Sequence, residues 1–451
     1  MKKNALIFLV FYFIMVNSKA QSLIKIYDSG ISYIFALDKD SALWCWGYDQ
    51  PPGKTGTDLI SPVKVNNNDK WLDIPKVYNF KYRFGIKKDG TLWKWEASST
   101  TPPNLWDRNS KWKAIASGSG QVIGIKEDGT LWSWGDDNAN GAQGNGTTIA
   151  YSTPFQISNE TNWIKVFAGE YYSMALKSDG TLWSWGSTGY GQLGLGFTGT
   201  INVLSPTQIQ GDDWEHVVCG RATTYALKKD STLWIWGSGE YGQMGNGETQ
   251  IINRSPVQLG TANDWTAIAA GDFHFIGMRG GRDVYSWGAN RYGEMGNGNA
   301  DVVKFPILIT TSAKAISAGY CKSFYINEDG SFCSAGENQT GTLGLGYNSI
   351  GFTTSFGCST PVITSVIEMN ESLNTKVYPN PFNEYCTIEP SKHFKKYNFE
   401  LFDEAGTRIQ QITNLEGWVT FKKDKLKPGV YFYVLKEMNT MEMVRGKLFI
   451  Q

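Results

Sequence analysis

The chain has 451 residues, more than one ordinary domain core usually holds, so several domains or a repeat array are expected. Apolar residues make up 41% and charged residues 19%, which excludes a disordered chain, and the 50 glycines and 18 tryptophans favour turns between aromatic-packed strands over long helices. The 42 basic and 42 acidic residues balance, which excludes the broad positive surface of a nucleic-acid-binding protein, so no nucleic acid partner is expected.

The N-terminus has the organisation of an export signal. Two lysines at positions 2 and 3 precede an apolar run over residues 5–16, and Ser18-Lys19-Ala20 follows. A charged start, a short apolar centre and a small-residue cleavage site are typical of a secretory signal peptide. We expect residues 1–20 to be removed by cleavage between Ala20 and Gln21. Neither this run nor any later apolar stretch is long enough to cross a bilayer, so no stable membrane span is expected.

Beyond this segment, one phrase recurs seven times at a period near 50 residues. Its full form is Leu-Trp-x-Trp-Gly, and the last two copies keep one or neither of the tryptophans. The copies begin at Leu43, Leu92, Leu131, Leu182, Leu233, Val284 and Phe332. Such a period indicates a repeat architecture, and we expect the tryptophans to form the core between successive repeats.

The fourth copy shows the internal order of one repeat most clearly. Its four predicted strands cover residues 163–166, 173–177, 181–185 and 206–209. Apolar residues alternate along the third strand, and Asp179-Gly180 supplies the two-residue hairpin turn before it. The fourth strand begins with proline and is therefore placed at an edge. Four antiparallel strands in each of seven copies predict an all-β fold, a seven-bladed β-propeller.

These motifs resemble the regulator of chromosome condensation repeat family. The matching pattern is W-x-x-I-x-x-G, then A-L-x-x-D-G-x-L-W-x-W-G, then G-Q-L-G-x-G, and it covers about residues 22–366. The resemblance implies a propeller domain, which we place at residues 21–368. In the second copy Glu96 replaces the closing glycine, and the seventh copy has lost both tryptophans, so these two blades are expected to be distorted.

A second domain is predicted at residues 377–451, after a polar linker at residues 369–376. Its predicted strands cover residues 398–402, 417–421, 429–435 and 446–450. They indicate a small β-sandwich, for which a carbohydrate-binding or fibronectin-like domain is the alternative. Four motifs, beginning at Tyr378, Leu401, Leu426 and Gly446, resemble the C-terminal sorting domain of type IX secretion substrates. The resemblance implies the type IX secretion machinery as a partner, and a secreted or cell-surface protein of a Gram-negative bacterium.

Motifs that carry chemistry are scarce. Three histidines, His216, His274 and His393, give little material for a metal site or a catalytic triad, and no phosphate-binding loop is present. We therefore assign no catalytic, cofactor-binding or metal-binding residue and expect no cofactor. The six cysteines lack CxxC spacing, which argues against a zinc site, and they allow 15 disulfide connectivities, so their pairing stays open.

The turn that follows the first strand of each repeat lies near the axis on one face of a propeller. In these turns, seven of the 21 residues after the turn glycines are Phe or Tyr, where the 14% aromatic content of the chain predicts about three. Aromatic residues with interspersed charges are typical of binding hot spots. The candidate binding face consists of Tyr33, Phe80, Tyr82, Tyr171, Tyr172, Arg221, Phe273, His274 and Tyr320. The alternative is that several of them, above all the third residue after each glycine, pack inside the blades.

The leading hypothesis is an exported, non-enzymatic propeller that recognises an unknown protein or glycan ligand through this face. The family's nucleotide-exchange role is not carried over, because export places the chain in another compartment. The repeats are also similar to secreted bacterial propellers that inhibit β-lactamases, which makes an enzyme inhibitor the first alternative. A glycan-binding adhesin would use Tyr33 and Tyr172 for stacking. A polysaccharide-active enzyme would need Glu170 and Asp272, which lie in non-adjacent blades.

Overall fold

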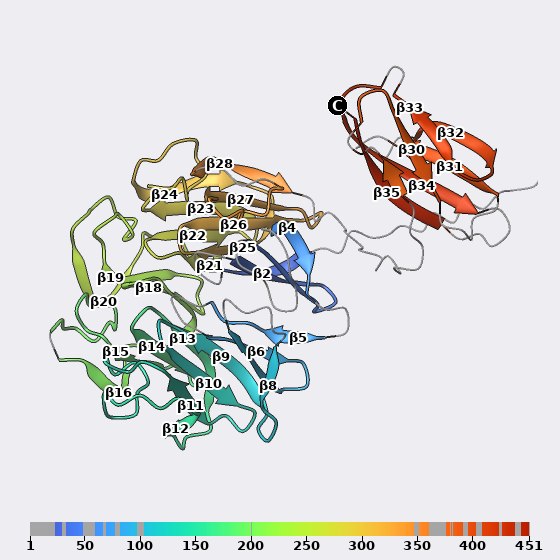
Figure 1. Cartoon of the computed structure of the whole chain (residues 1–451). Coiled ribbons are helices and arrows are strands. Elements are labelled where there is room, and N and C mark those ends of the chain that lie inside the picture. Colours follow the sequence, from blue (N-terminus) through green and yellow to red (C-terminus); the bar gives the residue numbers. More distant parts are fainter. Residues whose placement is uncertain are drawn as a thin grey trace, which may run out of the picture. The chain divides into compact units, whose positions relative to one another are not determined.

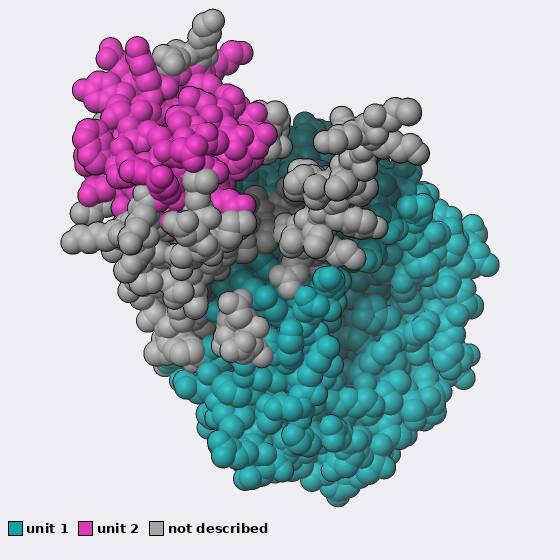
Figure 2. Space-filling model, turned by 90° about the vertical axis from the view of Figure 1, so that its right-hand side faces the viewer, with its two compact units in different colours: residues 1–362 teal, residues 363–451 magenta. Residues whose placement is uncertain are grey.

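The computed structural model describes residues 23–28, 33–47, 59–65, 69–76, 82–96, 103–199, 201–346, 351–359, 376–378, 380, 382–390, 396–402, 408–423, 426–437 and 443–450. All helical or extended elements in these ranges are β-strands, which confirms the all-β prediction. The chain forms two compact units, residues 1–362 and 363–451 (Figure 2). Within the described ranges there is no helix long and apolar enough to cross a membrane.

The first unit contains seven four-stranded antiparallel sheets, each built from four consecutive strands, which confirms the seven-bladed propeller. Each blade runs from an innermost to an outermost strand in chain order. The innermost strands are β1 (Leu23–Asp28), β5 (Trp71–Asp73), β9 (Trp112–Ser117), β13 (Trp163–Ala168), β17 (Trp214–Cys219), β21 (Trp265–Ala270) and β25 (Ala313–Gly319). The second strands are β2 (Tyr33–Asp38), β6 (Tyr82–Lys87), β10 (Gln121–Lys126), β14 (Tyr172–Lys177), β18 (Thr223–Lys228), β22 (His274–Arg279) and β26 (Lys322–Asn327).

The third strands carry the recurring tryptophan phrase. They are β3 (Leu43–Gly47), β7 (Leu92–Glu96), β11 (Leu131–Gly135), β15 (Leu182–Gly186), β19 (Leu233–Ser238), β23 (Asp283–Gly288) and β27 (Phe332–Glu337). The outermost strands are β4 (Leu59–Lys64), β8 (Asn104–Asp107), β12 (Phe155–Ser158), β16 (Val203–Gln208), β20 (Ile252–Gln258), β24 (Val303–Thr310) and β28 (Phe352–Ser359). In Figure 1 the blades follow one another around the ring in chain order, so that the first blade lies beside the seventh.

The propeller has seven hydrophobic clusters, one at each junction between neighbouring blades. The second tryptophan of each phrase lies in these clusters, as predicted, at positions 46, 95, 134, 185, 236 and 287. The first tryptophan is only half-buried at positions 93, 132, 183 and 234. There a lysine ammonium lies over the indole ring, 3.3 to 4.8 Å from its centroid. In these four blades the first tryptophan therefore seals the edge of a junction and the second fills it, whereas Trp44 of the first blade is itself buried.

The glycine-rich loop of one blade receives the buried tryptophan of the next. Trp236 donates its indole N–H to the carbonyl oxygen of Gln192, 2.8 Å away. A Cβ atom on Gly194 would lie 2.8 Å from the indole nitrogen, and the φ of Gly194 is 70°. Both facts require glycine at this position. The Gly-Gln-Leu-Gly motif is therefore explained by packing between blades.

The same contact closes the ring between the last blade and the first. Trp46 donates its indole N–H to the carbonyl oxygen of Thr342, 2.7 Å away. The hydroxyl of Ser317 donates to the carbonyl oxygen of Ile26, 2.8 Å away. No strand is exchanged between the described parts of these two blades, because each blade keeps four consecutive strands. The ring is thus closed by side-chain packing and isolated hydrogen bonds.

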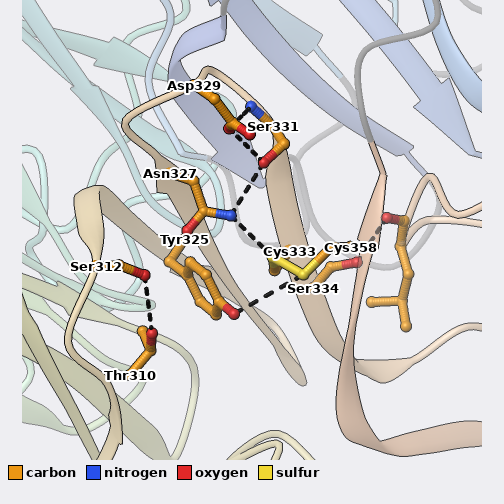
Figure 3. Close-up of a disulfide and its surroundings, with 10 residues drawn as sticks. Thr310, Ser312, Tyr325, Asn327, Asp329, Ser331, Cys333, Ser334 and Cys358 are labelled. Atoms are coloured by element: carbon orange, nitrogen blue, oxygen red, sulfur yellow. Dashed lines mark hydrogen bonds between the residues drawn. A yellow bond between two sulfur atoms is a disulfide. The ribbon is translucent and has the colours of Figure 1, made fainter.

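The seventh blade departs from the repeat, as the sequence indicated. Ala335 stands where other blades have the buried tryptophan, and Phe356 of β28 lies over Gly296 of the sixth blade in its place. Cys333 of β27 and Cys358 of β28 are directly opposite each other and form a disulfide, with Tyr325 and Asn327 beside the sulfur atoms (Figure 3). The other four cysteines, Cys45, Cys219, Cys321 and Cys386, are buried.

We expect the double replacement Cys333→Ala/Cys358→Ala to lower the free energy of unfolding of the propeller by about 2 kcal/mol. The disulfide ties the outermost strand of the last blade to β27, its neighbour in the sheet; the strand is also bridged to the sixth blade through Ser355 and Asn297. Urea unfolding with and without a reductant measures the effect. The reductant should destabilise the wild type and leave the double variant unchanged; equal destabilisation of both would contradict a role for this disulfide.

The second unit is a two-layered sandwich. One sheet has the strand order β29-β30-β33 and the other β32-β31-β34-β35. The strands are β29 (Lys376–Tyr378), β30 (Tyr385–Glu389), β31 (Tyr397–Phe402), β32 (Arg408–Leu415), β33 (Val419–Lys422), β34 (Gly429–Glu437) and β35 (Met443–Ile450). Ile388 and Phe421 from one sheet share a buried cluster with Phe399 and Leu435 from the other. This confirms the predicted β-sandwich, in which β29, β30 and β32 are strands outside the four predicted ranges.

Candidate binding face

Turns that follow the innermost strands are joined from blade to blade by backbone hydrogen bonds. The N–H of Ser119 donates to the carbonyl oxygen of Glu170 at 2.8 Å. The N–H of Arg221 donates to the carbonyl oxygen of Asp272 at 3.0 Å. The N–H of Asp272 donates to the carbonyl oxygen of Tyr320 at 3.1 Å. The ion pair between Glu170 and Arg221 connects the fourth blade to the fifth, so the third to seventh blades present these turns side by side on one face of the ring.

Three residues predicted for the binding face lie in the core instead. Tyr33, Tyr172 and His274 are 2%, 0% and 1% exposed. Each begins the second strand of its blade and points toward the following blade: the hydroxyl of Tyr172 lies 2.9 Å from the carbonyl oxygen of Thr223, and Nε2 of His274 lies 3.1 Å from that of Lys322. Their assignment to a ligand-contacting surface is wrong, because they hold neighbouring turns together.

Burial also removes His274 as a candidate acid or base. Desolvation, together with the positive charge of Lys76, lowers the pKa of His274 to about 3. The imidazole is therefore neutral at physiological pH. The residue serves as a polar link between blades.

Arg221 is the centre of the accessible part of the face. Its side chain is 47% exposed, and its Nε–H donates to Oε2 of Glu170 at 2.6 Å. Its guanidinium carbon lies 5.5 Å from the ring centroid of Phe273, whose ring meets that of Tyr241 edge-on at 5.0 Å. The aromatic face, as we call it from here on, consists of Glu170, Tyr171, Arg221, Tyr241, Phe273 and Tyr320.

Tyr82 and Phe80, which were also predicted for the binding face, are not assigned to the aromatic face. Tyr82 of the second blade is half-buried, and the ammonium of Lys94 lies 3.5 Å from its ring centroid. Phe80 lies outside the described residues, as do Ala20 and Gln21 at the predicted cleavage point.

Sequence reasoning missed the tyrosines of the glycine-rich loops. Tyr190 and Tyr241 are 51% and 38% exposed, and Tyr241 contacts Phe273 directly. Tyr190, Tyr241 and Tyr292 each precede the first glycine of the Gly-Gln-type motif in blades 4 to 6. An aromatic side chain recurring in an otherwise polar loop was the available signal. It was overlooked because the loop was assigned only to blade turns.

The acidic groups of this face surround the guanidinium of Arg221. Glu170 and Asp272 flank Arg221 in sequence-successive blades, and the Glu170 carboxylate is bound to the guanidinium. Asp272 is only 6% exposed. Among the described residues, no three His, Cys, Asp or Glu side chains are grouped so as to hold a metal ion.

Comparison with protein-family models gives two matches that together cover most of the chain. The model described as an RCC1-like domain matches residues 19–366. The model described as a secretion system C-terminal sorting domain matches residues 376–451. Both agree with the resemblances stated from the sequence motifs.

Curated relatives share part of the propeller. The E3 ubiquitin-protein ligase HERC2 of Homo sapiens is 30% identical over 159 residues, which are 35% of this chain and 3% of that protein. The ultraviolet-B receptor UVR8 of Arabidopsis thaliana is 28% identical over 213 residues, which are 46% of this chain and 48% of that protein. The matches thus span about half or less of these relatives.

Solved structures agree on the fold. Yeast RCC1 (Prp20), in a crystal structure with Kap60, has a TM-score of 0.61 at 18% sequence identity, covering 79% of this chain and 88% of that chain. The structure of human WBSCR16 has a TM-score of 0.58 at 18% identity, covering 66% of this chain and 85% of that chain. At such identities the likeness concerns the propeller architecture alone.

Proposed function

Because this chain belongs to the RCC1-like domain family and ends in a secretion system C-terminal sorting domain, we propose that it is an exported, non-enzymatic recognition protein. The propeller binds a partner protein through the aromatic face. The sorting domain directs the chain through type IX secretion to the cell surface or the medium of a Gram-negative bacterium.

The observation that carries the proposal is the setting of Arg221. The side chain is exposed, yet Glu170 holds its Nε and Phe273 lies against its guanidinium. A side chain already fixed in this way loses little conformational entropy when a partner binds. Arginine and aromatic residues are also the types enriched among residues that dominate binding energy. The aromatic face therefore has the composition and the order of a protein-binding surface.

A photo-crosslinking experiment in intact cells tests this function. The photoreactive amino acid p-benzoylphenylalanine replaces Tyr171 in one variant and Phe305 in another. Tyr171 is 36% exposed on the aromatic face, whereas Phe305 is 59% exposed on the outermost strand β24. We expect a discrete crosslinked protein from position 171 and none from the more exposed position 305. Adding Arg221→Ala should remove most of the crosslinked product.

Other outcomes would contradict the proposal. A crosslink that forms only from position 305 would move recognition to the outer strands. A crosslink from position 171 that is unaffected by Arg221→Ala would show that the guanidinium is not part of the contact. Thermal unfolding of each variant shows whether the propeller remains folded.

Glycan binding is the second candidate, and the exposed tyrosines favour it. Tyr171, Tyr190 and Tyr241 are 36%, 51% and 38% exposed, and tyrosine rings suit stacking against sugars because they are rigid and amphipathic. A crosslinked product from position 171 whose added mass is removed by glycosidases would favour this function over protein binding.

A further inference from the structure

The innermost strands of the seven blades enclose a central cavity of about 670 Å³. Each of the seven innermost strands contributes residues to its lining. Solvent reaches the cavity, because Glu215 and Lys25 both line it and are exposed. The cavity does not include Arg221 or any other member of the aromatic face. It is therefore a separate place on the molecule.

Polar side chains gather in one layer of this cavity. In four blades the residue two positions after the start of the innermost strand is ionisable, and in the other three it is alanine. The ionisable residues are Lys25, Asp73, Lys165 and His216. The same strand position lies at the same height in each blade, and all four residues line the cavity. Of the three alanines, Ala267 also lines the cavity.

The charge of the cavity opposes that of the domain around it. Three lysines and two acids line the axial part of the cavity, namely Lys25, Lys76, Lys165, Asp73 and Glu215, whereas the ammonium of Lys228 lies over the rings of Trp214 and Trp234. Residues 21–375 together contain 27 basic and 33 acidic residues. An acidic domain with a locally basic cavity focuses positive potential inside the ring.

The two lysines of the polar layer are held differently. Lys25 forms an ion pair with Asp73 at 2.8 Å, and Asp73 also accepts a hydrogen bond from the hydroxyl of Tyr27 at 2.9 Å. Lys165 donates to the backbone carbonyl oxygen of Glu215 at 2.8 Å. A carbonyl orients an ammonium group but does not neutralise its charge. Lys165 therefore contributes a full positive charge at a fixed place in the cavity.

The pKa of His216 is affected by the charge of Lys165. Its ring is edge-on to Phe167 at 5.8 Å. Burial, followed by the charges of Lys165 and Lys25, lowers the pKa of His216 to about 4. The neutral imidazole can donate one N–H to an anion at physiological pH.

We propose that the central cavity binds a small multivalent oxyanion, bearing carboxylate or phosphate groups, between Lys165, Lys25 and the N–H of His216. The cavity volume falls within the range of small-molecule sites in proteins. Among the described residues Lys165 has no ion-pair partner, so the anion supplies a countercharge and receives charge-assisted hydrogen bonds, which are the stronger kind. This inference does not depend on the aromatic face.

Histidine NMR of the full chain gives a direct test, because the sequence has only three histidines. Protein labelled with 13C-histidine is titrated from pH 3.5 to 8 with citrate, with pyrophosphate, or with sodium chloride at matched ionic strength. A His216→Gln variant assigns the His216 signal. Citrate and pyrophosphate separate the carboxylate from the phosphate class. We expect one of them to raise the pKa of His216 by about one unit or more, because an anion nearby favours the charged imidazole. Sodium chloride should not do so.

Two charge variants complete the test. Lys165→Gln should weaken binding of the active anion at least tenfold, and Lys165→Arg should restore most of it. Lys304→Gln, which removes the same charge from the exposed outer strand β24, should bind like the wild type. No change of the His216 pKa with either anion, or equal weakening by Lys304→Gln and Lys165→Gln, would overturn the proposal. The His274 signal, from a site outside this layer, shows in each variant that the propeller is folded.

Discussion

Trp236→Ala is expected to lower the free energy of unfolding of the propeller by about 3 to 5 kcal/mol, the cost of deleting a fully buried tryptophan. The side chain is 0% exposed and fills the junction between the fourth and fifth blades. The substitution leaves a cavity beside Trp214, whose ring centroid lies 5.7 Å away. It also leaves the Gln192 carbonyl oxygen without the indole donor. The effect is measured by urea unfolding followed by tryptophan fluorescence and circular dichroism.

Trp234→Ala is the matched control, two residues away on the same strand. That indole is half-buried, donates to the Thr232 hydroxyl within its own hairpin, and lies under the Lys228 ammonium. Its removal should cost about 1 to 2 kcal/mol, since only part of its apolar surface is withdrawn from water. Equal losses for the two variants would contradict the distinction between the tryptophan that fills a junction and the one that seals its edge.

The repeat made most of the fold predictable. A phrase that returns every 50 or so residues, with an Asp-Gly hairpin and alternating apolar residues, specifies the same strands each time. The small sandwich has no such repeat: four of its seven strands were predicted from short apolar stretches between turns, whereas β29, β30 and β32 were not, and of these β32 is the longest. That strand, Arg408–Leu415, is mostly polar and exposed at a sheet edge, so no apolar alternation marks it.

The candidate binding face was less predictable, because its membership depends on the direction of adjacent side chains. Tyr171 and Tyr172 are neighbours in sequence, yet one is exposed and the other is buried beneath the next blade. The direction is set where the turn ends and the second strand begins, and this point cannot be located to one residue from composition. Contacts between blades, such as that of Tyr241 with Phe273, are invisible without the ring itself.

Glu294→Gln is expected to remove a loss of stability that the wild type undergoes as the pH rises. Glu294 occupies the place that glutamine holds in the two preceding blades. In each case the side-chain oxygen accepts the N–H of the tyrosine two residues earlier: Tyr190 to Gln192 at 2.9 Å, Tyr241 to Gln243 at 2.6 Å, and Tyr292 to Glu294 at 2.8 Å. Glutamine supplies this oxygen without a charge. Glutamate instead buries a negative charge whenever the pH is above the pKa of its carboxyl group.

Burial raises the pKa of Glu294 from 4.5 to about 7, and the N–H donors, Cys321 and Lys322 offset only part of this shift. Below pH 4.5 the carboxyl is protonated in both folded and unfolded chains and costs nothing. Between pH 4.5 and 7 the unfolded chain releases its proton first, so stability falls as the pH rises. Above pH 7 the full penalty applies, about 3 kcal/mol for a shift of this size.

Urea unfolding of the wild type and Glu294→Gln at pH 5 and pH 8 measures this penalty. The difference in the free energy of unfolding between the variant and the wild type should grow by most of the penalty of about 3 kcal/mol from pH 5 to pH 8. It falls short of that value because the wild type already carries part of the penalty at pH 5. Glu240→Gln, at an exposed site in the preceding blade, should follow the wild type at both pH values. A wild type whose stability relative to Glu294→Gln is the same at pH 5 and pH 8 would show that water or local rearrangement solvates the carboxylate. The glutamate would then be as well accommodated as the glutamines of the other blades.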